Sequence, residues 1–266
     1  MSNENKRAGA QKSSGLNTEA LKDLLFRVAD DSLILAHRHS EWTGFGPLLE
    51  EDIAFSSIAQ DKMGHANALF KILHEKLGEP NADAIAFGRT EDQFKCCQFV
   101  ELPNGGYDFS LVRHFLFDAS ELIRWQFLQQ SSFEPLAKLA AKIQGEVKYH
   151  VYHAQTWLVQ LGAQGNEESR ILMQTALDKA WPYALGIFEH GAAEGALIAD
   201  GVFVGEDVLQ SAWLEFVTER CAAAHLTIPT NTTAVLGGRK GYHTEHLKPL
   251  LDEMNEVFRI DPSAEW

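Results

Sequence analysis

Cysteine is scarce in this chain of 266 residues, and the three present, Cys96, Cys97 and Cys221, form neither a CxxC pair nor a disulfide framework. Such sparse cysteines are typical of a reducing compartment. No apolar run approaches the roughly 20 residues that a membrane-spanning helix needs, and the N-terminal stretch lacks the apolar segment of a signal peptide. The sequence therefore predicts a cytoplasmic protein whose residues 1–17 form a disordered leader.

Positive charge is also in short supply. Lysine and arginine number 23 against 37 aspartate and glutamate residues, so the formal net charge is −14. This balance argues against a general nucleic-acid binder, because phosphate contacts need clustered cations, and against adhesion to anionic membranes. The sequence also lacks a glycine-rich nucleotide fingerprint, a nucleophile elbow and a catalytic triad. Functional information must therefore come from the helical pattern.

Helical periodicity is abundant. Apolar residues recur at helical spacing in four long segments, at about 18–42, 47–77, 110–133 and 135–161. Shorter helices are predicted at about 167–190, 207–224 and 244–258. A long connection, 78–107, separates the second long helix from the third, and its segment 92–102 fits a short strand or a short helix equally well.

Four long helices with a long crossover between the second and the third are typical of a ferritin-like bundle. We therefore predict an all-α fold for residues 18–266, a ferritin-like four-helix bundle with additional C-terminal helices. Periodicity alone does not exclude another all-helical arrangement.

Each of the four long helices carries an unusual residue near the middle of its apolar stripe. These residues are Ser32, Lys62 with His65, Asp118, and Val147 with His150. Di-iron carboxylate bundles place a carboxylate, a Glu-x-x-His motif, a carboxylate and a second Glu-x-x-His motif on four such helices. Both histidines of that pattern are present here, but only one of its carboxylates, so we interpret the set as the core of a degenerate metal site.

The charge at these positions decides between a metal centre and a polar core. Two iron ions need roughly four carboxylates to approach neutrality in a buried site, whereas this set offers one and adds an ammonium group. Even at an effective dielectric of about 20, a unit charge 4 Å from Lys62 would interact with it by roughly 4 kcal/mol. We therefore predict no metal: Lys62 occupies the vacated position and pairs with Asp118, with Glu146 as a further compensating carboxylate.

Two alternatives stay open. His65, His150 and Asp118 (or Glu146) form a two-histidine, one-carboxylate set of the kind that holds mononuclear non-haem iron, and the chain would then be an independent oxygenase. A self-associating storage bundle is less favoured, because a storage site needs carboxylates at the same positions.

Two C-terminal motifs carry weaker information. "YHTEHL" places His243 and His246 one turn apart but does not match an HExxH zinc motif, so we interpret it as the start of a helix. "GGRKG" (237–241) lacks the rest of a P-loop, and we interpret it as a local basic turn that meets an anionic partner or a phosphate group.

Several longer stretches carry a family resemblance. They are "EWTGFGPLLEEDIA", "QDKMGHA", "AFGRTEDQF", "LPNGGYDF", "FLFDASE", "GEVKYH" and, most specific, "GGRKGYHTEHLKPLLDEMNEV". With these stretches in this order, the chain resembles the non-catalytic, ferritin-like C subunit of the multicomponent phenylacetyl-coenzyme A ring epoxidase. The resemblance covers essentially everything after the leader.

The resemblance implies a role in aerobic phenylacetate degradation, as the partner of a catalytic A subunit that is a sister bundle and keeps its di-iron ligands. It implies no cofactor in this chain, although His65 retains more of the ancestral site than a scaffold requires. It also implies that this chain contacts a coenzyme A thioester at the subunit interface. The matching residues for that contact are Gln93, Phe94, Lys95, Cys96, Ala196, Leu197 and Ile198.

Overall fold

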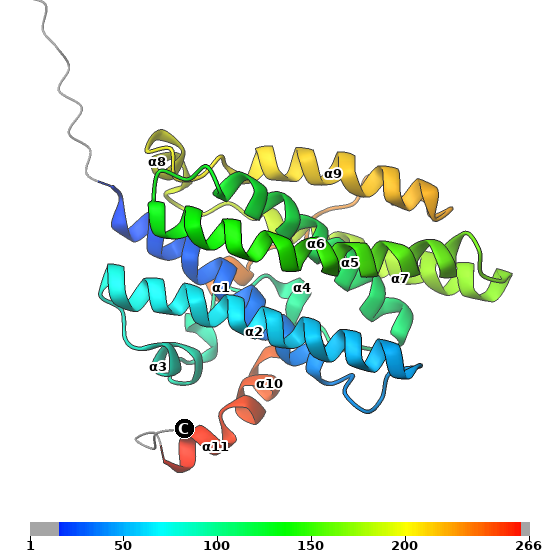
Figure 1. The fold of residues 1–266 in the computed structure, drawn as a ribbon, viewed down its shortest axis with the longest axis horizontal. Coiled ribbons are helices and arrows are strands. Elements are labelled where there is room, and N and C mark those ends of the chain that lie inside the picture. The colour runs from blue at the N-terminus through cyan, green and yellow to red at the C-terminus, as the bar shows by residue number, and fades with distance from the viewer. Residues whose placement is uncertain (1–15, 262–266) are drawn as a thin grey trace, which may run out of the picture.

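The computed structural model describes residues 16–261, and every regular element in that range is a helix (Figure 1). The four long helices are α1 (Thr18–Ser40), α2 (Leu49–Leu77), α5 (Tyr107–Leu128) and α6 (Glu134–Gly162). The crossover contains α3 (Ala82–Phe87), η1 (Glu91–Gln93) and α4 (Gln98–Glu101). After α6 come α7 (Glu167–Leu185), η2 (Gly186–Phe188), α8 (Glu194–Ala199), α9 (Glu206–Ala223), η3 (Gly238–Lys240), α10 (Leu247–Met254) and α11 (Glu256–Ile260).

The long helices pack as two hairpins, α1 with α2 and α5 with α6, and the two hairpins form one bundle (Figure 1). Helices α7 and α9 cover α5. The all-α prediction is confirmed: the fold is a ferritin-like helical bundle with additional C-terminal helices. Of the predicted leader, residues 1–15 lie outside the described range. None of the helices between residues 16 and 261 combines the length and the apolar character that a membrane crossing requires.

The ends of the helices follow local chemistry. Asn17 caps α1, because its side-chain oxygen accepts a hydrogen bond from the backbone N–H of Ala20 at 3.0 Å. Helix α2 ends at Leu77 and is capped by Gly78, whose φ of 75° lies in the left-handed region that glycine adopts without steric cost. Pro135, the first residue of the predicted segment 135–161, lies in the first turn of α6. Pro47, the first residue of the predicted segment 47–77, instead precedes α2, which begins at Leu49.

The segment 92–102, for which a short strand and a short helix were equally compatible with the sequence, contains no strand. It forms the end of η1 and the single turn of α4. Its Phe94 and Phe99 are fully buried, so the crossover contributes to the core. Three predicted helices are shorter than expected. The helix predicted at 167–190 is α7, which ends at Leu185 and is followed by η2. Residues 129–133 form the turn into α6, and the predicted C-terminal helix is divided into α10 and α11 at Asn255.

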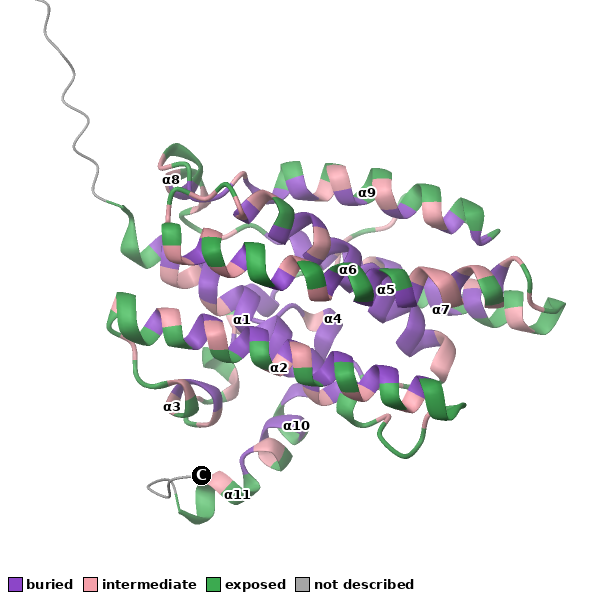
Figure 2. Ribbon diagram, in the orientation of Figure 1, coloured by how far each residue is buried: buried purple, intermediate pink, exposed green. Residues whose placement is uncertain are grey.

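Buried residues line the centre of the bundle and exposed residues its outer faces (Figure 2). Phe55, Phe115 and Trp125 are among the largest fully buried side chains. The indole N–H of Trp213 donates to the carbonyl oxygen of Leu116 at 2.9 Å, which fixes α9 against α5. The polar positions at the middle of the long helices are thus enclosed by apolar side chains, where a charged group needs a partner.

Candidate functional site

Lys62 lies at the centre of the bundle. Its side chain is 0% exposed, and Nζ lies 2.8 Å from Asp118 Oδ1 and 2.6 Å from Glu121 Oε2. Burial alone would lower the pKa of Lys62, but the Asp118 and Glu121 carboxylates raise it above its usual value. The predicted pair of Lys62 with Asp118 is therefore present, and the lysine is charged.

Glu121 is the second carboxylate of the site, and the sequence analysis missed it. It follows Asp118 by three residues on α5, so the two side chains lie on one face of that helix. The Ser32 hydroxyl lies 3.4 Å from Glu121 Oε1 and donates to the carbonyl oxygen of Val28 at 3.0 Å. Glu121 thus joins α1 to the ion pair. Its spacing of three residues after Asp118 was the signal by which the sequence could have identified it.

Two histidines surround Asp118. His114 Nδ1 donates to Asp118 Oδ2 at 2.7 Å, and burial lowers the pKa of His114 to about 4. His150 lies between two carboxylates, with Nδ1 3.2 Å from Asp118 Oδ1 and Nε2 3.0 Å from Asp61 Oδ2. Although burial disfavours its charged form, the hydrogen bonds to Asp118 and Asp61 raise the pKa of His150. The two carboxylates therefore favour the protonated form of His150, beside the ammonium group of Lys62.

The polar network continues toward the N-terminal end of α2. His153 Nδ1 lies 3.3 Å from His114 Nε2, and His153 Nε2 lies 3.0 Å from Glu51 Oε2. The hydroxyl of Tyr107 donates to the same carboxylate. One connected set of side chains from α1, α2, α5 and α6 thus replaces an apolar core here.

His65 and Glu146 form a separate pair at the seam between α2 and α6. His65 Nε2 donates to Glu146 Oε2 at 2.7 Å, and the Glu146 side chain is 42% exposed. Glu146 therefore pairs with His65, so its predicted role as a partner of Lys62 is wrong. Val147 is fully buried and supplies an apolar side chain at the fourth position of the degenerate site.

The central residues do not fit a di-iron centre. The ammonium group of Lys62 is hydrogen-bonded to both buried carboxylates, so neither is free to bind a cation. A divalent ion 4 Å from that ammonium group would be repelled by about 8 kcal/mol at an effective dielectric of about 20. The position that a di-iron protein uses for metal is occupied here by an ion pair.

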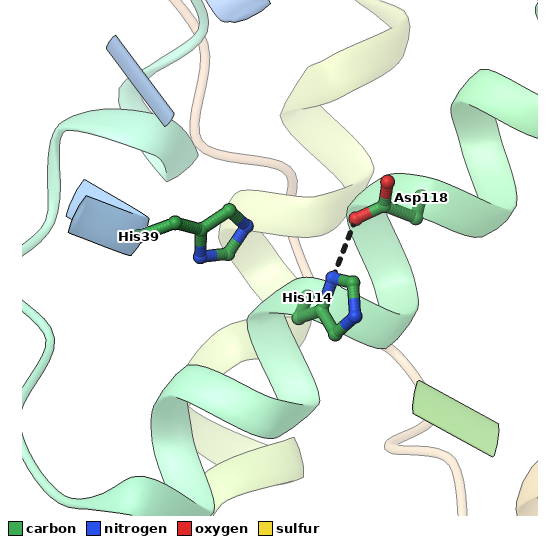
Figure 3. Close-up of side chains that lie close together, drawn as sticks. All are labelled: His39, His114 and Asp118. Carbon is green, nitrogen blue, oxygen red and sulfur yellow. Dashed lines mark hydrogen bonds and ion pairs between the residues drawn. The ribbon is translucent and has the colours of Figure 1, made fainter. Parts of the chain in front are cut away.

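The predicted mononuclear triad is not assembled either. Among the described residues, two groups bring three donor atoms within 4.8 Å of one another, and neither combines His65, His150 and Asp118. One group is His39, His114 and Asp118, in which the His39 ring on α1 faces the other two side chains on α5 (Figure 3). Both Asp118 oxygens already accept hydrogen bonds, one from Lys62, so this group is also a poor cation site.

His39 is the member of that group without a hydrogen bond. Both ring nitrogens are buried with no polar partner, and the ring makes edge contacts with Phe55 and His114. Burial, reinforced by the nearby His114 and Lys62, holds the pKa of His39 well below its usual value. His39 is thus a neutral, unsatisfied group in the core, which costs free energy in the folded state.

Replacing His39 with leucine is expected to stabilise the chain by about 1–2 kcal/mol at neutral pH, because two unpartnered nitrogens leave the core. The gain should be larger at acidic pH. Unfolded His39 takes up a proton as the pH falls below about 6.5, whereas the folded chain resists protonation there, so acid destabilises the wild type. Urea unfolding at pH 8 and pH 5 measures the difference; a gain that shrinks at pH 5 would contradict the assignment.

The second group of donors is Cys96, Glu101 and His243. His243 Nδ1 donates to Glu101 Oε1 at 2.6 Å, and the other Glu101 oxygen accepts from Thr244 N at 2.7 Å. Burial raises the pKa of the Cys96 thiol well above its usual value, so the thiol is unreactive. The predicted helix start at "YHTEH" is wrong: this segment anchors the C-terminal loop to α4, and α10 begins after His246.

The "GGRKG" motif is also a structural anchor. Arg239 donates to both oxygens of Asp31, each at 2.8 Å, and to the carbonyl oxygens of Lys95 and Ile187, each at 2.9 Å. A side chain at Gly238 would collide with the backbone of Cys96 and Cys97, so glycine permits this approach. The anionic partner predicted for the turn is thus a carboxylate of the chain itself.

The residues predicted to contact coenzyme A divide by burial. Phe94, Cys96 and Leu197 are 0–3% exposed, so they belong to the hydrophobic core and cannot contact a ligand in this conformation. The other predicted residues, Gln93, Lys95, Ala196 and Ile198, reach the surface to different degrees. Lys95 lines a cavity of about 350 Å³, where its ammonium group pairs with Asp23.

Comparison with known proteins agrees with this architecture. A family model described as phenylacetic acid catabolic protein matches residues 5–266. The chain belongs to this family. The C subunit of the 1,2-phenylacetyl-CoA epoxidase of Escherichia coli (strain K12) is 35% identical over 240 residues, which cover 90% of this chain and 96% of that protein. The family predicted from the quoted stretches is therefore confirmed, and it extends through the whole bundle.

Proposed function

We propose that this chain is a non-catalytic, structural subunit of a multicomponent ring 1,2-phenylacetyl-CoA epoxidase, and that it supports the catalytic di-iron subunit in aerobic phenylacetate degradation. The observation that carries the proposal is the buried ion pair of Lys62 with Asp118 and Glu121, at the position that a catalytic sister bundle would need for metal. The similarity to the C subunit of the E. coli epoxidase supports the same assignment.

The chain's own residues suit a supporting role. Its central polar groups hold one another through charge-assisted hydrogen bonds, and such a network specifies one arrangement of the four helices. The reactive chemistry then belongs to the partner, and this chain contributes a rigid helical surface. We infer no cofactor for this chain.

Iron content and turnover test the proposal. The chain, purified without chelators, is expected to contain far less than one iron per molecule by elemental analysis. It is also expected to oxidise no phenylacetyl-CoA when supplied with oxygen and a reductase. Added to the catalytic subunit, it should form a stable complex and raise turnover. Stoichiometric iron with turnover by this chain alone would support the mononuclear enzyme instead, and full turnover in its absence would reject the structural role.

A further inference from the structure

From Leu49 to Asn67, one exposed stripe on the outer side of α2 carries no charged side chain, although the chain has a net charge of −14; the next exposed residue along the stripe is Lys71. Exposed residues recur there at intervals of four, four, three, four and three. They are Leu49, Ile53, Ser57, Gln60, Gly64 and Asn67. Leu49 and Ile53 are 71% and 58% exposed, and Phe45, in the preceding loop, is 80% exposed. Solvated faces of helices normally carry charged side chains, so this stripe is atypical of a surface that faces water.

Helix α6 presents a second stripe of the same kind beside it. Gly145, Tyr149 and Tyr152 follow at intervals of four and three, and the two tyrosines are 53% and 63% exposed. Tyrosine is enriched at protein interfaces because it offers a large apolar ring and a polar end. The stripe is bordered by Lys142 and Lys148.

The two stripes belong to one face. Three contacts cross the seam between the helices, Glu51 with His153, Asp61 with His150, and His65 with Glu146. Their order shows that α2 and α6 run antiparallel, and in Figure 2 both helices lie on the side of the bundle turned to the viewer. The carboxylates in the seam are thus engaged by histidines of this chain.

Glycines near the middle of both helices also indicate an interface on this face. Gly64 and Gly145 are exposed, and a Cβ at either position would meet nothing within 4 Å in this chain. A glycine inside a helix costs about 1 kcal/mol relative to alanine, and neither is explained by contacts within the chain. Their positions on adjacent helices would let the backbone of another helix approach closely.

We propose that this α2/α6 face is the surface on which a second helical bundle docks. The inference rests on the proposed function, under which that bundle is the catalytic di-iron subunit. The α2 stripe from Leu49 to Asn67 is about 27 Å long, and two helices side by side are roughly 20 Å wide. The resulting area is of the order that one partner buries in a standard interface of ~800 Å² per side.

Charge and size select this occupant over two others. A second copy of this chain would bring two strongly negative molecules together, which mutual repulsion opposes. A single peptide helix would cover only the groove between α2 and α6 and leave the outer stripes exposed. A sister bundle with its own uncharged helical face would cover both stripes.

Binding of purified variants to the catalytic subunit tests the surface. Ile53→Asp and Tyr152→Asp place a charge on each stripe and should weaken the complex at least about tenfold in calorimetric titration. The matched control is Ile171→Asp, at a 59% exposed position on α7, which should leave the affinity unchanged. Gly64→Trp should also weaken the complex, whereas Gly64→Ala should raise the melting temperature of the free chain. Circular dichroism confirms that each variant is folded.

The outcomes distinguish failure of this inference from failure of the proposed function. Normal binding by Ile53→Asp, Tyr152→Asp and Gly64→Trp would overturn the surface and leave the structural role intact. No binding by the wild type would overturn both. The wild type could also dimerise alone, with Ile53→Asp making it monomeric and leaving its affinity for the catalytic subunit unchanged. In that case the occupant of the face is a second copy, and the inference is wrong.

Discussion

Replacing Lys62 with methionine is expected to lower the free energy of unfolding by about 3–5 kcal/mol. Methionine fills a similar volume but leaves the carboxylates of Asp118 and Glu121 buried without their shared cation. Stranding a buried charge costs far more than losing an exposed ion pair, because the group keeps its desolvation penalty. Urea unfolding at neutral pH, followed by circular dichroism, measures the change.

A matched control separates the effect of breaking the ion pair from the effect of removing a lysine side chain. Lys71→Met removes a lysine from an exposed position on the same helix and should change stability by no more than about 0.5 kcal/mol. Adding Glu121→Leu to Lys62→Met should recover part of the loss, because one of the two stranded carboxylates is then absent. A Lys62→Met variant as stable as the wild type would mean that the ammonium group is not paired in the folded chain.

The fold could be predicted because helical periodicity is a local property. The apolar stripes of α1, α2, α5 and α6 identified four long helices, and the long crossover between them indicated the class of bundle. The errors lie at the ends. Residues 129–133 contain no strong breaker, yet the chain turns there to bring α6 against α5, and tertiary packing decides such a boundary.

The site could be predicted only where a template supplied one position on each helix. Lys62, Asp118 and His150 come together as expected because they occupy the inward positions of the bundle. Glu121 and His114 flank Asp118 by one turn on α5, and a template of single positions does not include them. Glu146 was placed correctly near the site but given the wrong partner, because periodicity does not show that it lies at the seam with α2.

Contacts between residues far apart in the sequence could not be predicted, for a different reason. Arg239 and Asp31 are 208 residues apart, and their pairing depends on how the C-terminal segment returns to α1. The sequence showed a basic, glycine-rich turn and suggested an external anion. Only the three-dimensional structure shows that the carboxylate comes from the chain itself.

Replacing Arg239 with alanine is accordingly expected to destabilise the chain by about 3–5 kcal/mol. The substitution leaves the Asp31 carboxylate, which is 8% exposed, without its two-pronged partner, and it frees the carbonyl oxygens of Lys95 and Ile187. Lys240→Ala is the control, since that neighbouring side chain is 64% exposed and its ion pair with Glu189 should contribute about 1 kcal/mol at most.

Limited proteolysis distinguishes loss of the anchor from general unfolding. In Arg239→Ala the segment 227–246 should become sensitive at protease concentrations that leave the bundle helices intact, because the anchor fixes that segment to α1. Arg239→Lys should rescue only part of the stability, since an ammonium group cannot match the two oxygens of Asp31 as a guanidinium does. Wild-type stability of the lysine variant would contradict this account, because the geometry of the guanidinium would then contribute nothing.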